Sequence, residues 1–299
     1  MRKIKKQKTK LTWLLTTILV FLSVYLLSMV LLIAWNMITT LKSTFEYEFL
    51  ENRLGLPTDP TLENYSVALK YFSVKVFDED TGAYLYYNIW SQFGNSLLYA
   101  VGCAVTQTLI PCLVAYIVAR YRYKFLNVYY MIVIVTMSLP IIGALPSEIM
   151  ISKTLGLYDT FWGQWIMKAH FLGIYFLVFY AQFKMIPYEY TEAAKIDGAS
   201  NFRTMTMIIM PLAWSTISTV LLLSFVGFWN DYQAPMLYLP SYPVAAYGIF
   251  LFQDSQEQLL SYTPTKLAGI TLLAIPIIVV FLVFQNKLMT NLSIGGLKG

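Results

Sequence analysis

Long apolar stretches without a charged side chain constrain this chain more than any other feature. Four of them are Leu11–Leu41, Phe125–Pro146, Thr204–Asn230 and Leu267–Asn286. Each contains the roughly 20 residues that a helix needs to cross about 30 Å of hydrocarbon. Charged residues make up only 12% of the 299 residues, against roughly a quarter in soluble globular proteins. The sequence therefore predicts a protein that crosses a membrane several times.

Two further crossings are predicted from weaker signals. The charge-free stretch Thr81–Ala119 begins with many polar and aromatic residues, so we place a crossing at Asn95–Val118. Another, at Phe161–Phe183, contains Lys168 and His170 but ends in a dense apolar run. Lipid offers the backbone no hydrogen-bond partners, and a helix satisfies its own. We therefore expect an all-α membrane protein with six transmembrane helices.

The distribution of charge orients these helices. If both termini are cytoplasmic, the inner segments are 1–13, 119–125, 184–211 and 287–299, which hold 14 Lys and Arg against 3 Asp and Glu. The remaining segments hold 7 basic and 13 acidic residues. An excess of positive charge inside is typical of membrane proteins, and six of the cations precede the first helix, where they can face anionic lipid. The net charge of +5 therefore requires no nucleic-acid partner.

The same boundaries organise the chain into segments. They are a basic cytoplasmic N-terminus (1–13), a first transmembrane helix (14–40), an extracytoplasmic loop (41–90), a transmembrane core (91–286) and a cytoplasmic C-terminal tail (287–299). The outer loop is acidic and too long for a simple connection, which indicates a function or local structure of its own. Pro111, Pro140 and Pro276 fall within spans and should kink them. Cys103 and Cys112 both fall in the second crossing, where we expect small buried side chains rather than a disulfide or metal site.

The cytoplasmic segment 184–211 lies between the predicted fourth and fifth helices and has a pattern of its own. Pro187 can open a helix because its missing N–H is not needed there, and the residues up to Asp197 favour helix. Gly198 can adopt the left-handed conformation that ends a helix, and Ser200 can cap a second helix. The predicted product is a helix, a glycine turn and a second helix held just beneath the bilayer.

The spacing within this segment resembles the EAA signature of permeases of binding-protein-dependent ABC importers. The matching positions are Glu192, Ala193, Ala194, Gly198, Ile208 and Pro211. Met210 stands where the family usually has Leu, an exchange that conserves apolar volume. Five other stretches resemble the sugar branch of this family, and within it the smaller permease of maltose-type transporters: Phe93–Leu97, Ala115–Arg120, Leu155–Gly163, Phe228–Asp231 and Gly295–Gly299. The resemblance covers about residues 90 to 299.

This resemblance implies a non-enzymatic permease subunit of a bacterial cytoplasmic-membrane importer. Its expected partners are a second permease, a dimer of ATPase subunits, an extracytoplasmic solute-binding protein, a sugar substrate and membrane lipid. The chain has no GxxxxGK[ST] phosphate loop, so ATP and Mg should bind to the partner ATPase and not to this chain. The tail 287–299 resembles the family's tail that reaches between the ATPase subunits.

The resemblance also assigns roles to the residues of the cytoplasmic loop, which is expected to couple the ATPase to the helices. Glu192 should provide a polar anchor, because a carboxylate is a strong acceptor for a partner's amides or cations. Ala193 and Ala194 should provide a face for close packing. The other expected coupling residues are Asp197, Gly198, Ile208 and Pro211.

Candidates on the substrate side are fewer. Sugars are usually bound by aromatic faces and by planar polar side chains, and such side chains occur together at the outer end of the fifth crossing: Trp229, Asn230, Asp231 and Tyr232. They are candidates for the pathway or for a docking surface, and anchoring at the membrane interface is the alternative. Lys168 is a candidate because charged side chains within spans are often functional. Alternatively, the span begins later and Lys168 extends its amine toward water.

Three other classes of protein compete with a sugar permease. An importer permease for a non-sugar solute would share the loop and differ only in what it carries. A secondary transporter would need paired intramembrane carboxylates for ion coupling, and the interiors of the predicted spans contain none. A membrane-embedded enzyme would need clustered His, Asp or Glu, whereas the chain has a single His. The sequence therefore favours the sugar importer.

Overall fold

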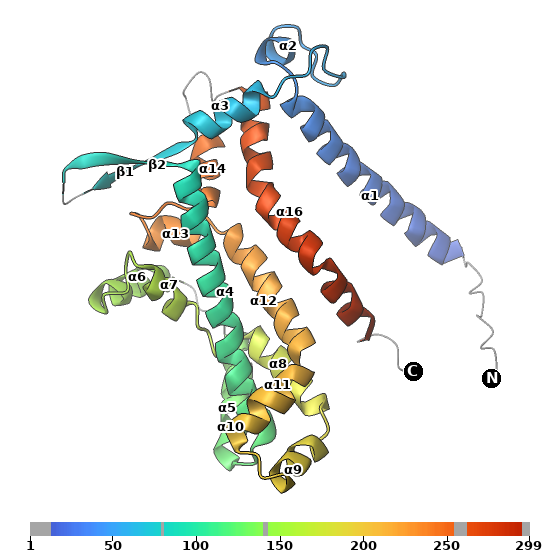
Figure 1. Cartoon of the computed structure of the whole chain (residues 1–299), viewed down its shortest axis with the longest axis vertical. Coiled ribbons are helices and arrows are strands. Elements are labelled where there is room, and N and C mark those ends of the chain that lie inside the picture. Colours follow the sequence, from blue (N-terminus) through green and yellow to red (C-terminus); the bar gives the residue numbers. More distant parts are fainter. Residues whose placement is uncertain (1–12, 79–80, 140–142, 254–261, 295–299) are drawn as a thin grey trace. The chain divides into compact units, whose positions relative to one another are not determined.

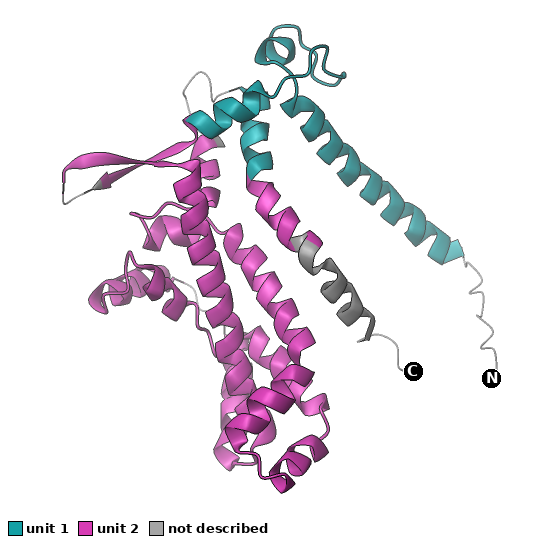
Figure 2. Cartoon of the chain, viewed as in Figure 1, with its two compact units in different colours: residues 1–70, 255–272 teal, residues 71–254, 273–299 magenta. Residues whose placement is uncertain are grey.

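A computed structural model of the chain describes residues 13–78, 81–139, 143–253 and 262–294. It contains two compact units, one of residues 1–70 and 255–272 and the other of residues 71–254 and 273–299 (Figure 2). Within the described residues, three helical stretches are long and apolar enough to cross a membrane. They are α1 (Trp13–Thr40), α4 (Ile89–Arg120) and the Thr263–Val280 part of α16 (Thr263–Ile294). A bent pair of helices, Asn201–Leu212 and Trp214–Trp229, is a fourth candidate.

The first unit contains α1, two short helices of the outer loop and the start of α16. The short helices are α2 (Thr44–Glu48) and α3 (Glu63–Tyr71), the last residue of which belongs to the second unit. Asn64 is buried and its amide nitrogen donates to the carbonyl oxygens of Thr40 and Lys42, at 2.8 and 2.7 Å. The hydroxyl of Thr265 in α16 donates to the Asn64 side-chain oxygen at 3.2 Å. The outer loop therefore has the local structure that its length predicted.

The buried carboxylate of Glu46 organises the segment that follows α1. Its Oε1 accepts hydrogen bonds from the side-chain amide of Asn52 at 2.7 Å and from the backbone N–H and hydroxyl of Thr58 at 2.8 and 3.0 Å. The Lys42 amine, fully buried, donates to the carbonyl oxygens of Asn52 and Arg53 at 2.7 and 3.2 Å. The Thr58 N–H is the main cause of a lowered pKa for Glu46, and Asn52 and Lys42 also contribute. We call the segment 42–58 the outer cap.

The second unit begins with a β-hairpin, which corrects the expectation of a purely helical fold. Strands β1 (Ser73–Asp78) and β2 (Ala83–Asn88) pair antiparallel, with Ser73 opposite Asn88 and Asp78 opposite Ala83. Both segments are rich in β-branched and aromatic residues, which favour strands. Gly82 has a φ of +65° beside β2, a conformation that glycine adopts at low cost. The hairpin signal was present in the sequence but lay inside the extracytoplasmic loop 41–90, for which no strands were predicted.

Helix α4 is the centre of the second unit (Figure 1). It packs against α7 (Phe161–Met167), α8 (Ile174–Met185), α12 (Trp214–Trp229) and α14 (Ala245–Gln253). Gly102 permits the closest approach, because a Cβ at this position would lie 2.0 Å from Nε1 of Trp165 in α7. Cys103 and Cys112 of α4 are buried and free, as predicted. In a membrane, such close packing is itself a main source of helix association, since lipid is as apolar as the side chains.

The remaining helices of the second unit surround this centre. They are α5 (Lys124–Ser138), α6 (Leu145–Thr154), α13 (Gln233–Tyr238), and the helices α9, α10 and α11 of the loop described below. Helices α4 and α16 continue through Pro111 and Pro276. Pro140, the third proline with an expected kink, lies outside the described residues. Helix α16 also continues through Lys287 to Ile294, so part of the predicted tail is helical, and residues 295–299 are not described.

Three predicted crossings differ from the structure in their continuity. The helix expected at 125–146 ends at Ser138, so α5 has only 15 residues. The stretch 161–183 forms α7 and α8 with a break between them, where Lys168 caps α7 through its N–H, which donates to the Gln164 carbonyl at 2.9 Å. The break contains polar residues and a glycine, which are less favourable in an apolar helix than the side chains of α7 and α8. The stretch 204–230 bends by 75° near Ala213, two residues after Pro211, whose missing N–H removes a helical hydrogen bond.

Candidate functional site

The loop between α8 and α12 folds as a helix, a glycine turn and a second helix. Helix α9 (Glu189–Ile196) has its C-cap at Asp197 and is followed by Gly198, which has a φ of +74°. The N–H of Gly198 donates to the Lys195 carbonyl at 3.1 Å, and the N–H of Ala199 donates to the Ala194 carbonyl at 2.9 Å. These two bonds define a Schellman motif. The predicted glycine turn is therefore confirmed, although α9 begins at Glu189 and not at Pro187.

The second half of the loop returns to the apolar helices through a change in helical pitch. The Ser200 hydroxyl accepts from the Arg203 N–H at 3.3 Å and caps α10 (Asn201–Thr204), as predicted. A π-helical turn, η1 (Met205–Ile209), and the short α11 (Met210–Leu212) follow, before the 75° bend into α12. Turns of this kind occur often at functional sites. The loop is thus a compact element whose last helices are not collinear with the span that follows.

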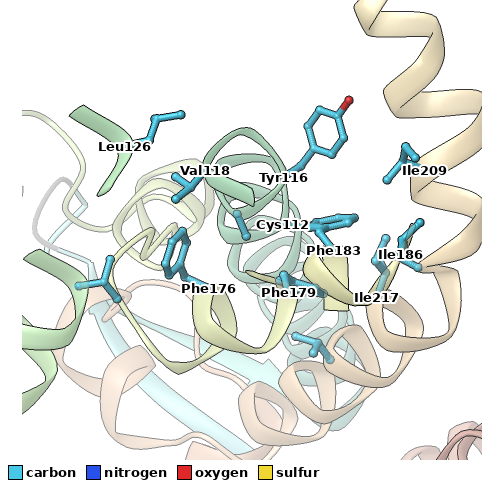
Figure 3. Packing of buried hydrophobic residues seen from close by; sticks show 14 residues of the cluster. Cys112, Tyr116, Val118, Leu126, Phe176, Phe179, Phe183, Ile186, Ile209 and Ile217 are labelled. Carbon is cyan, nitrogen blue, oxygen red and sulfur yellow. The ribbon is translucent and has the colours of Figure 1, made fainter. Parts of the chain in front are cut away.

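Both ends of the loop are embedded in one apolar cluster, which we call the root cluster (Figure 3). Ile186 precedes the loop and Ile209 lies at its end, and they are 8% and 0% exposed. Helices α4, α8 and α12 supply most of the other buried members: Cys112, Ala115, Tyr116, Val118, Phe176, Phe179, Phe183, Ile217 and Val220. Because packed cores resist deformation, this cluster attaches the loop firmly to these three helices.

The two alanines of the signature differ in their exposure. Glu192 and Ala193 are exposed, whereas Ala194 is only 3% exposed and packs toward the protein. Consecutive residues of a helix point about 100° apart, so the two methyl groups cannot form a single outward face. Asp197 is exposed at the end of α9. The roles of these residues in coupling remain predictions.

The remaining signature positions lie near the end of the loop. Ile208 is half-buried and packs against the root cluster. Pro211 is exposed in α11. Both therefore adjoin the bend into α12, where they are placed to influence how the loop is attached to the span.

Large apolar side chains project outward from the loop. Tyr190 and Ile196 of α9 are 48% and 86% exposed, and Phe202 and Met207 are 72% and 66% exposed. Exposed apolar groups that gather in one region indicate an interaction surface, and these four lie on α9, α10 and η1 within a single loop. These four residues form what we call the loop surface.

A basic cavity adjoins the start of the loop. It has a volume of about 510 Å³ and lies between the end of α4, the start of α5 and the residues that lead into α9. Its cations are Arg120, Arg122, Lys124 and Lys184. Arg120 is only 7% exposed, and its Nε and Nη2 have no hydrogen-bond partner among the residues that the structure describes. The sequence showed a basic residue near a helix end, but nothing in it indicated that this guanidinium would be buried.

Three of the four substrate-side candidates in 229–232 have structural partners. The Trp229 indole is 3% exposed, stacks with Phe93 and donates to the Leu273 carbonyl at 3.3 Å. Asp231 accepts from the Tyr99 hydroxyl at 2.9 Å. Tyr232 stacks on Phe250 at 4.6 Å between ring centroids. These contacts indicate packing more directly than binding.

The other two candidates are less engaged. Asn230 is exposed and its side-chain amide donates to the Val226 carbonyl of its own helix at 2.9 Å. Lys168 is half-buried at the end of α7. The structure therefore places Lys168 at a break between helices and not in the middle of a continuous span.

An apolar helical unit with an exposed helical loop between spans is the architecture of a multi-pass membrane protein, and sequence comparison makes the assignment specific. Residues 112–292 match the family model described as "binding-protein-dependent transport system inner membrane component". This match covers more than half of the chain and includes the whole loop. The chain belongs to this family and is a multi-pass protein of the bacterial inner membrane.

Individual relatives extend the similarity to nearly the whole chain. The arabinooligosaccharides transport system permease protein of Halalkalibacterium halodurans is 27% identical over 98% of this chain and 100% of its own length. The trehalose transport system permease protein of Mycobacterium tuberculosis is 30% identical over 69% of this chain and 78% of its own. The diacetylchitobiose uptake system permease protein of Streptomyces coelicolor is 25% identical over 87% and 82%.

A solved structure has the same fold. It is a chain from the crystal structure of a bacterial ABC transporter involved in the import of the acidic polysaccharide alginate, with a TM-score of 0.72 and 23% identity. The match covers 91% of this chain and 95% of that one. The helical architecture described above is therefore shared with a chain of that transporter.

Proposed function

We propose that this chain is the permease subunit of an ATP-driven importer for a sugar or oligosaccharide, and that it couples to an ATPase dimer through the segment 184–211. ATP and Mg bind to the ATPase and not to this chain. A second permease completes the pathway, and an extracytoplasmic solute-binding protein delivers the substrate. The six crossings and the cytoplasmic location of both termini are part of this proposal.

The observation that carries the coupling role is the combination of the loop surface with the buried root cluster. Tyr190, Ile196, Phe202 and Met207 offer apolar contacts to a partner, and Glu192 offers a carboxylate beside them. Ile186 and Ile209 meanwhile fix the loop to three helices. A partner that holds this surface differently in its two nucleotide states would shift the equilibrium between two arrangements of the helices.

The names of the relatives support the class of substrate. Arabinooligosaccharides, trehalose and diacetylchitobiose are all carbohydrates. None of these relatives is more than 30% identical to this chain over the aligned residues, so we propose carbohydrate as a class and no particular sugar. A permease for a non-sugar solute would use the same loop, so transport assays alone distinguish it from a sugar permease.

The test reconstitutes the chain with the second permease, ATPase and binding protein encoded beside it, and measures uptake of labelled oligosaccharides and amino acids. We expect ATP-dependent uptake of a carbohydrate. In the same system, Phe202→Ala should weaken association with the ATPase about tenfold or more, because buried aromatic anchors dominate such interfaces. Uptake should fall accordingly.

The matched control is Met150→Ala, which truncates a side chain that is 71% exposed on α6, away from the loop. It should leave ATPase association unchanged. Carbohydrate uptake that is unaffected by Phe202→Ala would contradict the docking role, whereas uptake of amino acids alone would contradict the substrate class.

A further inference from the structure

We propose that the basic cavity at the start of the loop is a binding site for a phosphate-bearing anion, either the headgroup of an anionic lipid or a free phosphate. The transport function proposed above does not require this site. The inference rests on three features of the cavity: its excess of positive charge, the buried and unpaired guanidinium of Arg120, and the aromatic rings that accompany its cations.

The charge of the cavity is unbalanced. Arg120, Arg122, Lys124 and Lys184 line it, and Glu189 is its single acidic lining residue. Glu189 is exposed in the first turn of α9, where water and the helix N-terminus both stabilise its charge. Four cations that line one cavity create a positive potential that attracts anions.

Among the residues of the cavity, Arg120 gives the strongest reason to expect a bound ligand. Burial of a charged donor without a partner is costly, and both Nε and Nη2 of Arg120 are in this state among the described residues. The C-terminal end of α4 favours a cation electrostatically, yet neither nitrogen has an acceptor within hydrogen-bond distance in the part of the chain that the structure describes. A phosphate group supplies several acceptor oxygens in the geometry that a planar guanidinium recognises.

Aromatic rings accompany two of the other cations. The guanidinium of Arg122 lies 5.5 Å from the centre of the Tyr188 ring, which also lines the cavity. The Lys184 amine lies 5.5 Å from the centre of the Tyr180 ring. A ring attracts a cation through its quadrupole and does not neutralise it. These contacts therefore restrain the two side chains and leave their charge available to an anion.

The position of the cavity gives the bound anion a structural consequence. Its lining comes from residues 118–127, which join α4 to α5, and from residues 183–189, which lead into α9. An anion held by both segments would stabilise the start of the loop on the end of α4. In the proposed orientation the cavity faces the inner leaflet, the surface of which is rich in anionic lipid.

The test uses the full chain in nanodiscs of phosphatidylcholine, with and without phosphatidylglycerol. Native mass spectrometry measures how much phosphatidylglycerol remains bound after stepwise delipidation. In parallel, inorganic phosphate is titrated into the phosphatidylcholine nanodiscs against chloride at equal ionic strength, with calorimetric detection. We expect preferential binding of at least one probe, and a loss of about tenfold in Arg120→Met, since a charge-assisted hydrogen bond contributes at least that factor.

Three further variants make the result specific. Arg120→Lys keeps the charge without the planar donor geometry and should recover part of the binding. Lys184→Gln leaves the buried residue intact, so it tests the cavity even if Arg120→Met fails to fold, and it should weaken binding in the same direction. Lys153→Gln removes an exposed cation of α6 outside the cavity and should bind like the wild type.

The two probes separate the sources of the anion. Retention of phosphatidylglycerol without a response to phosphate assigns the site to lipid, and a response to phosphate without phosphatidylglycerol assigns it to a free phosphate; either result supports the site. Binding of neither probe overturns it. An equal loss of binding in Lys153→Gln also overturns it, because the effect would then follow net charge and not the cavity.

Discussion

At the residue scale, Gly198 turns the chain after α9 with a φ of +74°, and Arg120 holds a buried positive charge at the end of α4. The end of α9 depends on a local conformation that few residues adopt, so Gly198 and the cap at Ser200 were predictable from their types and spacing. The burial of Arg120 depends on the end of α4, the start of α5 and the residues that lead into α9, which meet only in the folded protein. Its charge is visible in the sequence, but the loss of its water and the lack of an acceptor are not.

Substitutions at Gly198 can distinguish whether coupling depends on the glycine turn or on the space that the missing side chain leaves. A Cβ at this position would meet nothing within 4 Å in this chain, so the constraint within the subunit is its φ of +74°. Valine pays about 1–2 kcal/mol in the left-handed region, which asparagine visits more readily. We expect Gly198→Val to lower the ratio of uptake to ATP hydrolysis several-fold, and Gly198→Asn to retain most of it.

Both variants are measured in proteoliposomes, together with hydrogen exchange at the end of α9. Faster exchange in Gly198→Val and near-normal exchange in Gly198→Asn would show that the turn itself has changed. Loss of coupling in both variants with normal exchange would contradict this account, because the partner would then need the missing side chain and not the turn.

At the element scale, hydropathy predicted where apolar segments occur better than it predicted whether each segment forms one unbroken helix. Helices α1 and α4 are each long and apolar enough to cross a membrane and lie close to their predicted positions. The break around Lys168 and the bend after Pro211 arise from a few polar, glycine or proline residues, which a count of charges over a window averages away. The hairpin β1–β2 was missed because a membrane chain was expected to be entirely helical, and no strands were predicted in the loop that contains it.

The outer cap provides a prediction about pH. The pKa of Glu46 is lower in the folded protein than its ordinary value of 4.5. A depressed carboxyl pKa stabilises the folded form at pH values above the ordinary pKa, and this contribution is lost as the pH falls through the folded-state pKa. We therefore expect hydrogen exchange in residues 42–58 to accelerate as the pH is lowered below about 4.5, in excess of the intrinsic change.

Glu46→Gln should exchange faster than the wild type at neutral pH, because one neutral amide oxygen replaces a carboxylate that accepts three hydrogen bonds. Its exchange should also lack the additional acid dependence. Glu63→Gln alters an exposed carboxylate in the first turn of α3 and serves as the control. An acid response in the outer cap of Glu46→Gln equal to that of the wild type would assign the pH dependence to another group.

At the scale of the whole molecule, the number of crossings cannot be derived from helix length alone. Helix α1 exposes apolar side chains on all sides, with none of its 18-residue apolar window buried, which suits lipid or another subunit equally. Helices α5 and α8 are apolar but have only 15 and 12 residues, shorter than the roughly 20 required for a complete crossing. Topology therefore depends on which side of the membrane each connection reaches.

Single cysteines answer this question without removal of the native ones, because Cys103 and Cys112 are both 0% exposed. Ser66, Thr154 and Asn201 are exposed, and each is replaced by cysteine and treated with a membrane-impermeant maleimide in vesicles of either orientation, without the ATPase. Six crossings require Ser66→Cys and Thr154→Cys to react from outside and Asn201→Cys from inside. Opposite sides for residues 154 and 201 require an odd number of crossings between them, which α7 and α8 must supply as one broken span. If both react from the same side, α7 and α8 do not cross the membrane together, and the loop cannot face a cytoplasmic ATPase while Thr154 lies outside.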